Sequence, residues 1–287
     1  MRIKGTILIL GLGLLLISCA QKEKKTSVKK APKLTENPTK KVLLYKDIQW
    51  GKLNPARGDN SPLAATLWGD RNAEVPTGFL AKFKDGFSSP PHIHNVTYKA
   101  VVIKGTIHND DPKAEMMWMK SGSFWTQPAY QPHITAAKGN VNIALVEIDQ
   151  GPYLVKPIEE AKTTYERPIN IDKTNVVWLG HNQTNWISKN SNAEISFLWE
   201  NKTSSSQGLF VKIPPRTKMK LLSTGEAFHS VVIKGEVDYF ISNSINSLVA
   251  GSYFSSKLNT FHQLENKKDK EAVLYINTNG KVMIEGK

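Results

Sequence analysis

The chain has 287 residues, of which 40% are hydrophobic, and its formal net charge is +13. Residues 1–19 contribute +2 of this charge and residues 22–46 contribute +7, so only +4 remains for residues 47–287. This distribution does not favour a nucleic-acid-binding body, and the single cysteine, Cys19, excludes an internal disulfide framework.

Residues 1–19 have the features of a bacterial lipoprotein signal peptide. Arg2 and Lys4 form a positive start, residues 6–17 are apolar but too short to span a bilayer, and Leu16-Ile17-Ser18-Cys19 resembles the lipobox. We therefore expect Cys19 to carry fatty-acyl chains such as palmitate and to anchor the protein in the bacterial cell envelope, outside the cytoplasm. An ordinary secretory signal that contains a cysteine is the alternative, and the membrane leaflet stays open.

Residues 20–46 are predicted to form a flexible, lysine-rich linker. Nine lysines accompany Thr, Ser, Pro and Asn, and large apolar side chains are few. Such a segment cannot bury enough surface to fold, and its charge favours contact with anionic lipid head groups. We expect a disordered tether beside the membrane, and no nucleic-acid partner, because no aromatic residues are interleaved with the lysines.

The rest of the chain contains an internal repeat with an offset of about 130 residues. The sequence Val-Val-Ile-Lys-Gly at 101–105 recurs unchanged at 231–235, and residues 77–83 are echoed by residues 207–213. Both copies consist of short runs rich in Val, Ile, Phe and Trp between turn residues, which predicts antiparallel strands. The predicted strands include residues 78–83, 98–103, 116–119 and 141–148 in the first copy, and residues 209–213, 230–233, 237–241 and 272–276 in the second. We therefore predict an all-β chain with two barrels, residues 47–157 and 168–287.

Candidate metal ligands lie in the first copy. His92 and His94 are two residues apart on a predicted strand, so their side chains point to the same face. His133, on a strand folded back alongside, would supply a third imidazole. Three protein ligands with an open position are typical of a catalytic metal site, whereas an isolated His-x-His pair is usually exposed or hydrogen-bonded.

The spacing of these residues resembles the two motifs of the cupin family. Residues 86–105 keep the spacing of the first cupin motif, with glycine at both ends, His-x-His after five residues, and a ligand position four residues after the second histidine. Tyr98 occupies that ligand position, where cupins usually have a glutamate. Residues 122–133 resemble the second motif. The resemblance implies two tandem jelly-roll barrels, and together with the lipobox it resembles bacterial cupin lipoproteins of unknown function.

The donor set predicts one divalent transition metal held by His92, His94 and His133. Imidazole suits several metals, and the missing carboxylate puts iron or zinc ahead of manganese, nickel and copper. Tyr98 is expected to act as a proton donor or orienting group, with a metal-bound phenolate as the alternative. Trp125 is expected to form part of the pocket wall.

The second copy lacks most of these donors. At the repeat offset, His92 corresponds to Leu222, His94 to Thr224 and Tyr98 to Phe228, and only His262 persists. We therefore expect the second barrel to bind no metal.

Three functions stay open at this point. The leading hypothesis is a metal-dependent envelope enzyme that acts on a small oxygenated metabolite, such as a sugar acid. The alternatives are a non-catalytic ligand-binding or sensing cupin lipoprotein, and a structural lipoprotein whose metal only adds stability. The expected partners are a small molecule and the membrane, reached through the lipid anchor, and a homodimer is left open.

Overall fold

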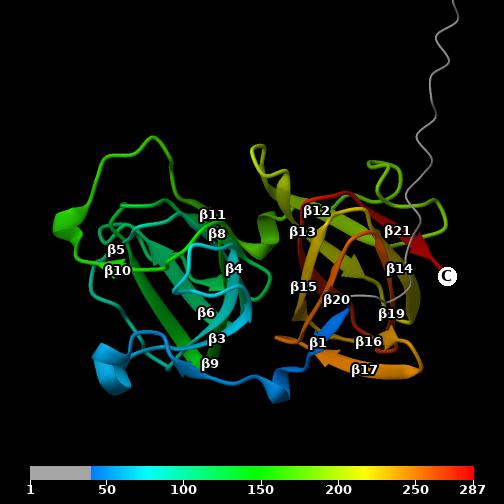
Figure 1. Ribbon diagram of the computed structural model, residues 1–287, viewed down its shortest axis with the longest axis horizontal. Helices are drawn as coiled ribbons and strands as arrows, with labels where there is room; N and C mark the ends of the chain where they lie inside the picture. The colour runs from blue at the N-terminus through cyan, green and yellow to red at the C-terminus, as the bar shows by residue number, and fades with distance from the viewer. Residues whose placement is uncertain (1–39) are drawn as a thin grey trace, which may run out of the picture. The chain divides into compact units, whose positions relative to one another are not determined.

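The computed structural model describes residues 40–287, and the expected signal peptide, Cys19 and most of the basic linker lie outside this range. The regular secondary structure of the described chain is almost entirely β-strand, which confirms the predicted all-β class with two jelly-roll barrels (Figure 1). Within residues 40–287, no helix is long and apolar enough to cross a bilayer. Short 3-10 helices are η1 (Tyr45–Asp47), η2 (Pro55–Asn60), η3 (Ile158–Glu160) and η4 (Lys173–Asn175).

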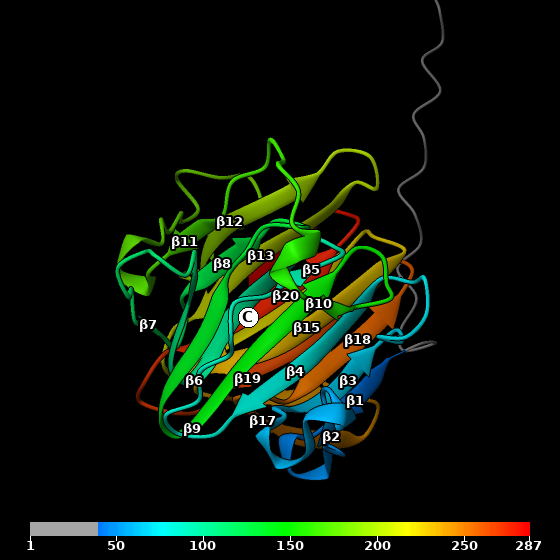
Figure 2. The same ribbon diagram turned by 90° about the vertical axis from the view of Figure 1, so that its left-hand side faces the viewer.

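The first barrel is formed mainly by one large antiparallel sheet, in the order β11-β8-β6-β9-β4-β3-β2. In Figure 2, β6, β9, β4 and β3 run side by side. The strands are β2 (Gly51–Lys52), β3 (Leu63–Trp68), β4 (Thr77–Phe83), β6 (Tyr98–Asp110), β7 (Met119–Lys120), β8 (Phe124–Gln127), β9 (Ile134–Ile148) and β11 (Ile169–Ile171), with β5 (Ile93–His94) paired to β10 (Val155–Lys156).

The second barrel is formed by two antiparallel sheets. The first has the order β1-β18-β15-β20-β13-β12 and the second has the order β17-β16-β19-β14-β21. The strands of the first are β1 (Lys41–Leu43), β12 (Glu194–Asn201), β13 (Ser206–Ile213), β15 (Ala227–Lys234), β18 (Tyr253–Lys257) and β20 (Ala272–Thr278). Those of the second are β14 (Thr217–Ser223), β16 (Glu236–Ile241), β17 (Ser244–Val249), β19 (Thr260–Asn266) and β21 (Val282–Gly286).

The repeated sequences occupy equivalent strands. Val101 lies on β6 between β8 and β9, and Val231 lies on β15 between β18 and β20. Both copies also place a tryptophan, after a register shift, directly over a glycine of the next strand: Trp68 faces Gly78, and Trp199 faces Gly208. A Cβ on either glycine would lie about 2 Å from its indole, so both positions require glycine.

Two strands cross the expected domain boundaries. β1, which lies in the predicted linker, pairs with β18 of the second barrel, and β11, which lies in the predicted second domain, pairs with β8 of the first barrel. Residues 41–46 are therefore ordered and do not form a flexible tether. This segment is ordered because its apolar side chains Val42 and Leu44 pack against the core of the second barrel.

The side-chain alternation on β6 separates two apolar layers. Ala100 and Val102 pack inside the first barrel, whereas Val101 and Ile103 belong to a cluster that also contains Phe210 and other residues of the second barrel. The two barrels therefore pack against each other through the outer faces of their large sheets.

Candidate metal centre

The three predicted histidines converge at one end of the first barrel. One ring nitrogen from each of His92, His94 and His133 lies within 4.8 Å of the others. His94 is on β5, and the backbones of His92 and His133 pair with each other, with N-to-O distances of 3.1 and 3.0 Å. This pairing brings together residues that are about forty positions apart in the sequence. His94 and His133 are buried, whereas His92 is half-buried.

Each imidazole is oriented by a backbone carbonyl that faces its Nδ1 atom. The Nδ1-to-oxygen distances are 2.9 Å for His92 to Pro90, 3.0 Å for His94 to Leu154 and 3.2 Å for His133 to Gln131. A carbonyl can only accept a hydrogen bond, so the proton of each ring lies on Nδ1 and the lone pair is on Nε2. Three imidazole nitrogens this close together can act as ligands of one divalent transition metal.

The local electrostatics keep these rings neutral. Burial lowers the pKa of His133 to about 3, with a smaller contribution from His92, and it lowers the pKa of His94 well below the usual value. The pKa of His92 is also lowered, chiefly by burial. Neutral imidazole is the ligating form, so the residues present fit a divalent metal.

Tyr98 lies beside this cluster as a neutral phenol. Its hydroxyl donates to Asn109 Oδ1 at 2.8 Å and lies 3.4 Å from His133 Nε2. Burial raises its pKa well above the usual value near 10. Asn109 in turn donates to Gln127 at 3.0 Å and accepts from Thr135 at 2.7 Å, so a buried polar network fixes the tyrosine.

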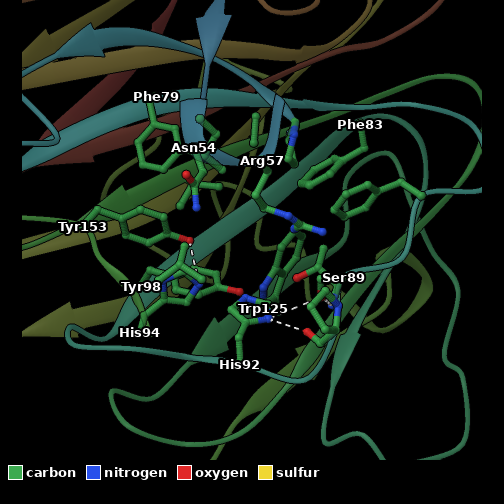
Figure 3. A pocket seen from close by; sticks show the side chains of 18 residues that line it. Asn54, Arg57, Phe79, Phe83, Ser89, His92, His94, Tyr98, Trp125 and Tyr153 are labelled. Carbon is green, nitrogen blue, oxygen red and sulfur yellow. Dashed lines mark hydrogen bonds between the residues drawn. The ribbon is translucent and has the colours of Figure 1, made fainter. Parts of the chain in front are cut away.

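A cavity of about 140 Å³ opens next to the histidines (Figure 3). Trp125, as expected, forms part of its wall, together with Phe79, Phe83 and other apolar side chains. The cavity is lined by His92, His94 and Tyr98 as well as Trp125, and His133 lies behind the other two histidines, with a ring nitrogen within 4.8 Å of theirs.

Tyr153 and Arg57 also line the cavity, and the sequence reasoning did not find them. The Tyr153 hydroxyl lies 3.0 Å from His94 Nε2 and donates to it, because the Nδ1 proton of that ring is used elsewhere. A metal would use the same lone pair, so the hydrogen bond and the metal bond exclude each other. Neither residue belongs to a recognisable motif, since Arg57 is on η2 and Tyr153 precedes β10.

The remaining histidine of the second motif, His262, has a different environment in the second barrel. Its Nδ1 lies 2.8 Å from the Tyr239 hydroxyl and its Nε2 lies 3.1 Å from Ser256 Oγ. The ring is fully buried and stacks on Phe228, which occupies the Tyr98 position. Both nitrogens are hydrogen-bonded to side chains, so this histidine has a packing role, and residues 40–287 contain no histidine cluster around it.

The two jelly-roll barrels are the fold of a two-domain cupin protein, and the three-histidine cluster fits a divalent metal. The chain belongs to the family described as "Domain of unknown function (DUF4437)", whose model matches residues 41–285. No curated protein matches the chain.

Several solved structures share the fold at low sequence identity. A protein of Nostoc punctiforme described as a "putative dioxygenase" has a TM-score of 0.64 and 13% identity over 85% of this chain and 82% of that one. The oxalate decarboxylase of Lactobacillus farciminis has a TM-score of 0.56 and 12% identity over 87% and 88%. A Bacillus subtilis oxalate decarboxylase variant has a TM-score of 0.51 and 14% identity over 86% and 78%. At these identities the similarity shows the fold alone.

Proposed function

We propose that the first barrel is the catalytic part of a metal-dependent enzyme that acts on a small oxygenated metabolite, such as a sugar acid. One observation carries the proposal. His92, His94 and His133 are held by carbonyls so that one ring nitrogen of each lies within 4.8 Å of the others, and His92 and His94 line a cavity. A site built only for stability would not need a cavity of this kind next to its ligands.

The three histidines would hold the metal, and the other cavity residues would act on the bound molecule. The metal would supply Lewis-acid or redox chemistry. Tyr98 holds a proton at its hydroxyl at neutral pH and is fixed by Asn109, which suits a proton donor or an orienting group. The apolar side chains around Trp125 would limit the access of water to a molecule bound in the cavity.

The metal is proposed to be ferrous iron or zinc. An all-imidazole set carries no negative charge, which weakens the case for manganese, and imidazole also accepts nickel and copper. A related fold does hold manganese, since one Bacillus subtilis oxalate decarboxylase structure is described by its Mn(II) centres.

We further propose that Cys19 is lipidated and places both barrels at the bacterial cell envelope, outside the cytoplasm. The support is the sequence Leu16-Ile17-Ser18-Cys19 after an apolar run. The partners would then be a small molecule and the membrane, reached through the anchor.

The experiment that tests the proposed function is a turnover screen. Protein loaded separately with iron and zinc is incubated with a panel of small hydroxy, keto and sugar acids, and product formation and oxygen uptake are followed. We expect turnover of at least one acid with one metal, and none by His133→Ala protein. Binding of acids without turnover by any metal form would instead indicate a non-catalytic binding protein.

A further inference from the structure

The cavity of the first barrel contains hydrogen-bond donors for which residues 40–287 supply no acceptor. The Arg57 guanidinium lines the cavity, is half-buried, and forms no hydrogen bond or ion pair within this range. The indole Nε1–H of Trp125 is also unpartnered there and is 1% exposed. It lies beside the Tyr98 hydroxyl.

Asn54 adds a third donor from the same segment as Arg57. Its Oδ1 accepts from the Ala56 backbone N–H at 3.1 Å, which leaves the Nδ2 donors free. Figure 3 shows the side chains of Asn54 and Arg57 extending into the cavity. Both residues belong to the η2 turn, where Asn54 is the N-cap.

The cavity contains nothing that balances these donors. No aspartate or glutamate is present among its lining residues within the described chain. A donor without an acceptor is unfavourable where the wall excludes water, so the unpartnered groups favour a ligand that brings acceptor oxygens. A positive guanidinium fork matches a carboxylate with two parallel hydrogen bonds.

The rest of the wall indicates the body of this ligand. Phe79, Phe83 and Phe87 line the cavity, and they offer flat apolar surfaces and no partner for hydroxyl groups. A flat apolar acid would bury matching surface against these rings.

We propose that the substrate is a small organic acid with a flat apolar body, whose carboxylate is held by Arg57. Asn54 Nδ2 acts as a further donor to its oxygens. This inference rests on the proposed function, because it assigns the substrate class of that same cavity. The substrate proposed here keeps the acid group of the expected metabolite and has a flat apolar body in place of the carbohydrate.

The test uses benzoate and benzamide, which have the same shape and differ in charge. Binding to the full chain is measured by calorimetry for the wild type, Arg57→Gln and Arg216→Gln. The last is a matched control, because it removes an exposed arginine that pairs with Asp269 in the second barrel. We expect the wild type and Arg216→Gln to prefer benzoate by about tenfold or more, and Arg57→Gln to lose this preference.

Each protein is measured both free of metal and loaded with zinc, because a bound cation also attracts carboxylates. A preference in the metal-free wild type that Arg57→Gln abolishes supports the inference whatever the metal content. Equal binding of the two probes, no binding of benzoate at millimolar concentration, or a preference that survives Arg57→Gln would overturn it. Retained benzoate preference without turnover of any acid would overturn the proposed function alone.

Discussion

The contact between the barrels contains a carboxyl group whose protonation should govern the stability of the fold. Glu147 on β9 is 3% exposed, and it accepts from the Tyr275 hydroxyl at 2.5 Å and from Asn277 Nδ2 at 3.1 Å, both on β20. Burial raises the pKa of Glu147 to about 7, against the lowering effects of Lys99 and these hydrogen bonds, and nearby Asp149 raises it further. The carboxyl of the unfolded chain titrates near 4.5.

Between these two values the folded state holds a proton that the unfolded state has lost. The contribution of Glu147 to the free energy of unfolding is therefore fully present below about pH 4.5 and is lost as the pH rises through about 7. The contribution of Glu147 to the free energy of unfolding therefore falls by about 2–3 kcal/mol between pH 5 and pH 8. Buried histidines act in the opposite direction, since burial lowers the pKa of His229 to about 4 and that of His262 to about 3.

The comparison of wild type with Glu147→Gln removes the histidine contribution, which both proteins share. Urea unfolding is measured at several pH values from 5 to 8, and the wild-type free energy of unfolding minus that of the variant is plotted. We expect this difference to fall by about 2–3 kcal/mol as the pH rises. A difference that stays constant, or rises with pH, would refute the assignment of a protonated Glu147 between the barrels.

Three further predictions concern the metal centre and the anchor. Tyr98→Phe should keep its metal and lower the turnover about a hundredfold or more, because we propose that the neutral phenol serves as a proton donor. Loss of most metal in elemental analysis would instead show that the phenolate is a ligand. Tyr153→Phe should bind zinc a few-fold more tightly than the wild type, because the variant lacks the hydroxyl that donates to His94 Nε2. A titration against a chelator measures this, and weaker zinc binding by the variant would show that the hydroxyl does not compete with the metal. Cys19→Ser should abolish fatty-acid labelling and release the protein from the membrane fraction, whereas an unlabelled, soluble wild type would show that the lipobox reading is wrong.

The sequence predicted the fold and the histidine cluster because both depend on local periodicity. His92 and His94 share a strand face, and His133 follows from the spacing of the second motif, so their meeting required only the expected pairing of two chain segments. The repeat predicted the second barrel, and the loss of donors at Leu222 and Thr224 led to the prediction, tested below, that this barrel binds no metal.

The parts that escaped prediction depend on contacts between distant segments. Arg57 reaches the cavity from an irregular turn, and Tyr153 reaches it from the connection before β10, and neither has a spacing that relates it to the histidines. The pairing of β1 with the second barrel and the pairing of β11 with the first barrel were also not predicted. A signal was present, because Val42 and Leu44 are apolar at the end of the basic segment, but the lysines around them dominated its composition.

The central claim is that the metal is bound by the first barrel and not by the second. Elemental analysis of the purified wild type, His133→Ala and His262→Ala tests it most directly, because the two variants remove equivalent residues of the repeat. His133→Ala leaves two imidazoles, whereas His262→Ala removes a ring whose nitrogens are both bound to side chains. We predict about one metal ion per chain in the wild type and in His262→Ala, and almost none in His133→Ala. Equal metal in the wild type and His133→Ala, or loss of metal in His262→Ala, would contradict the account.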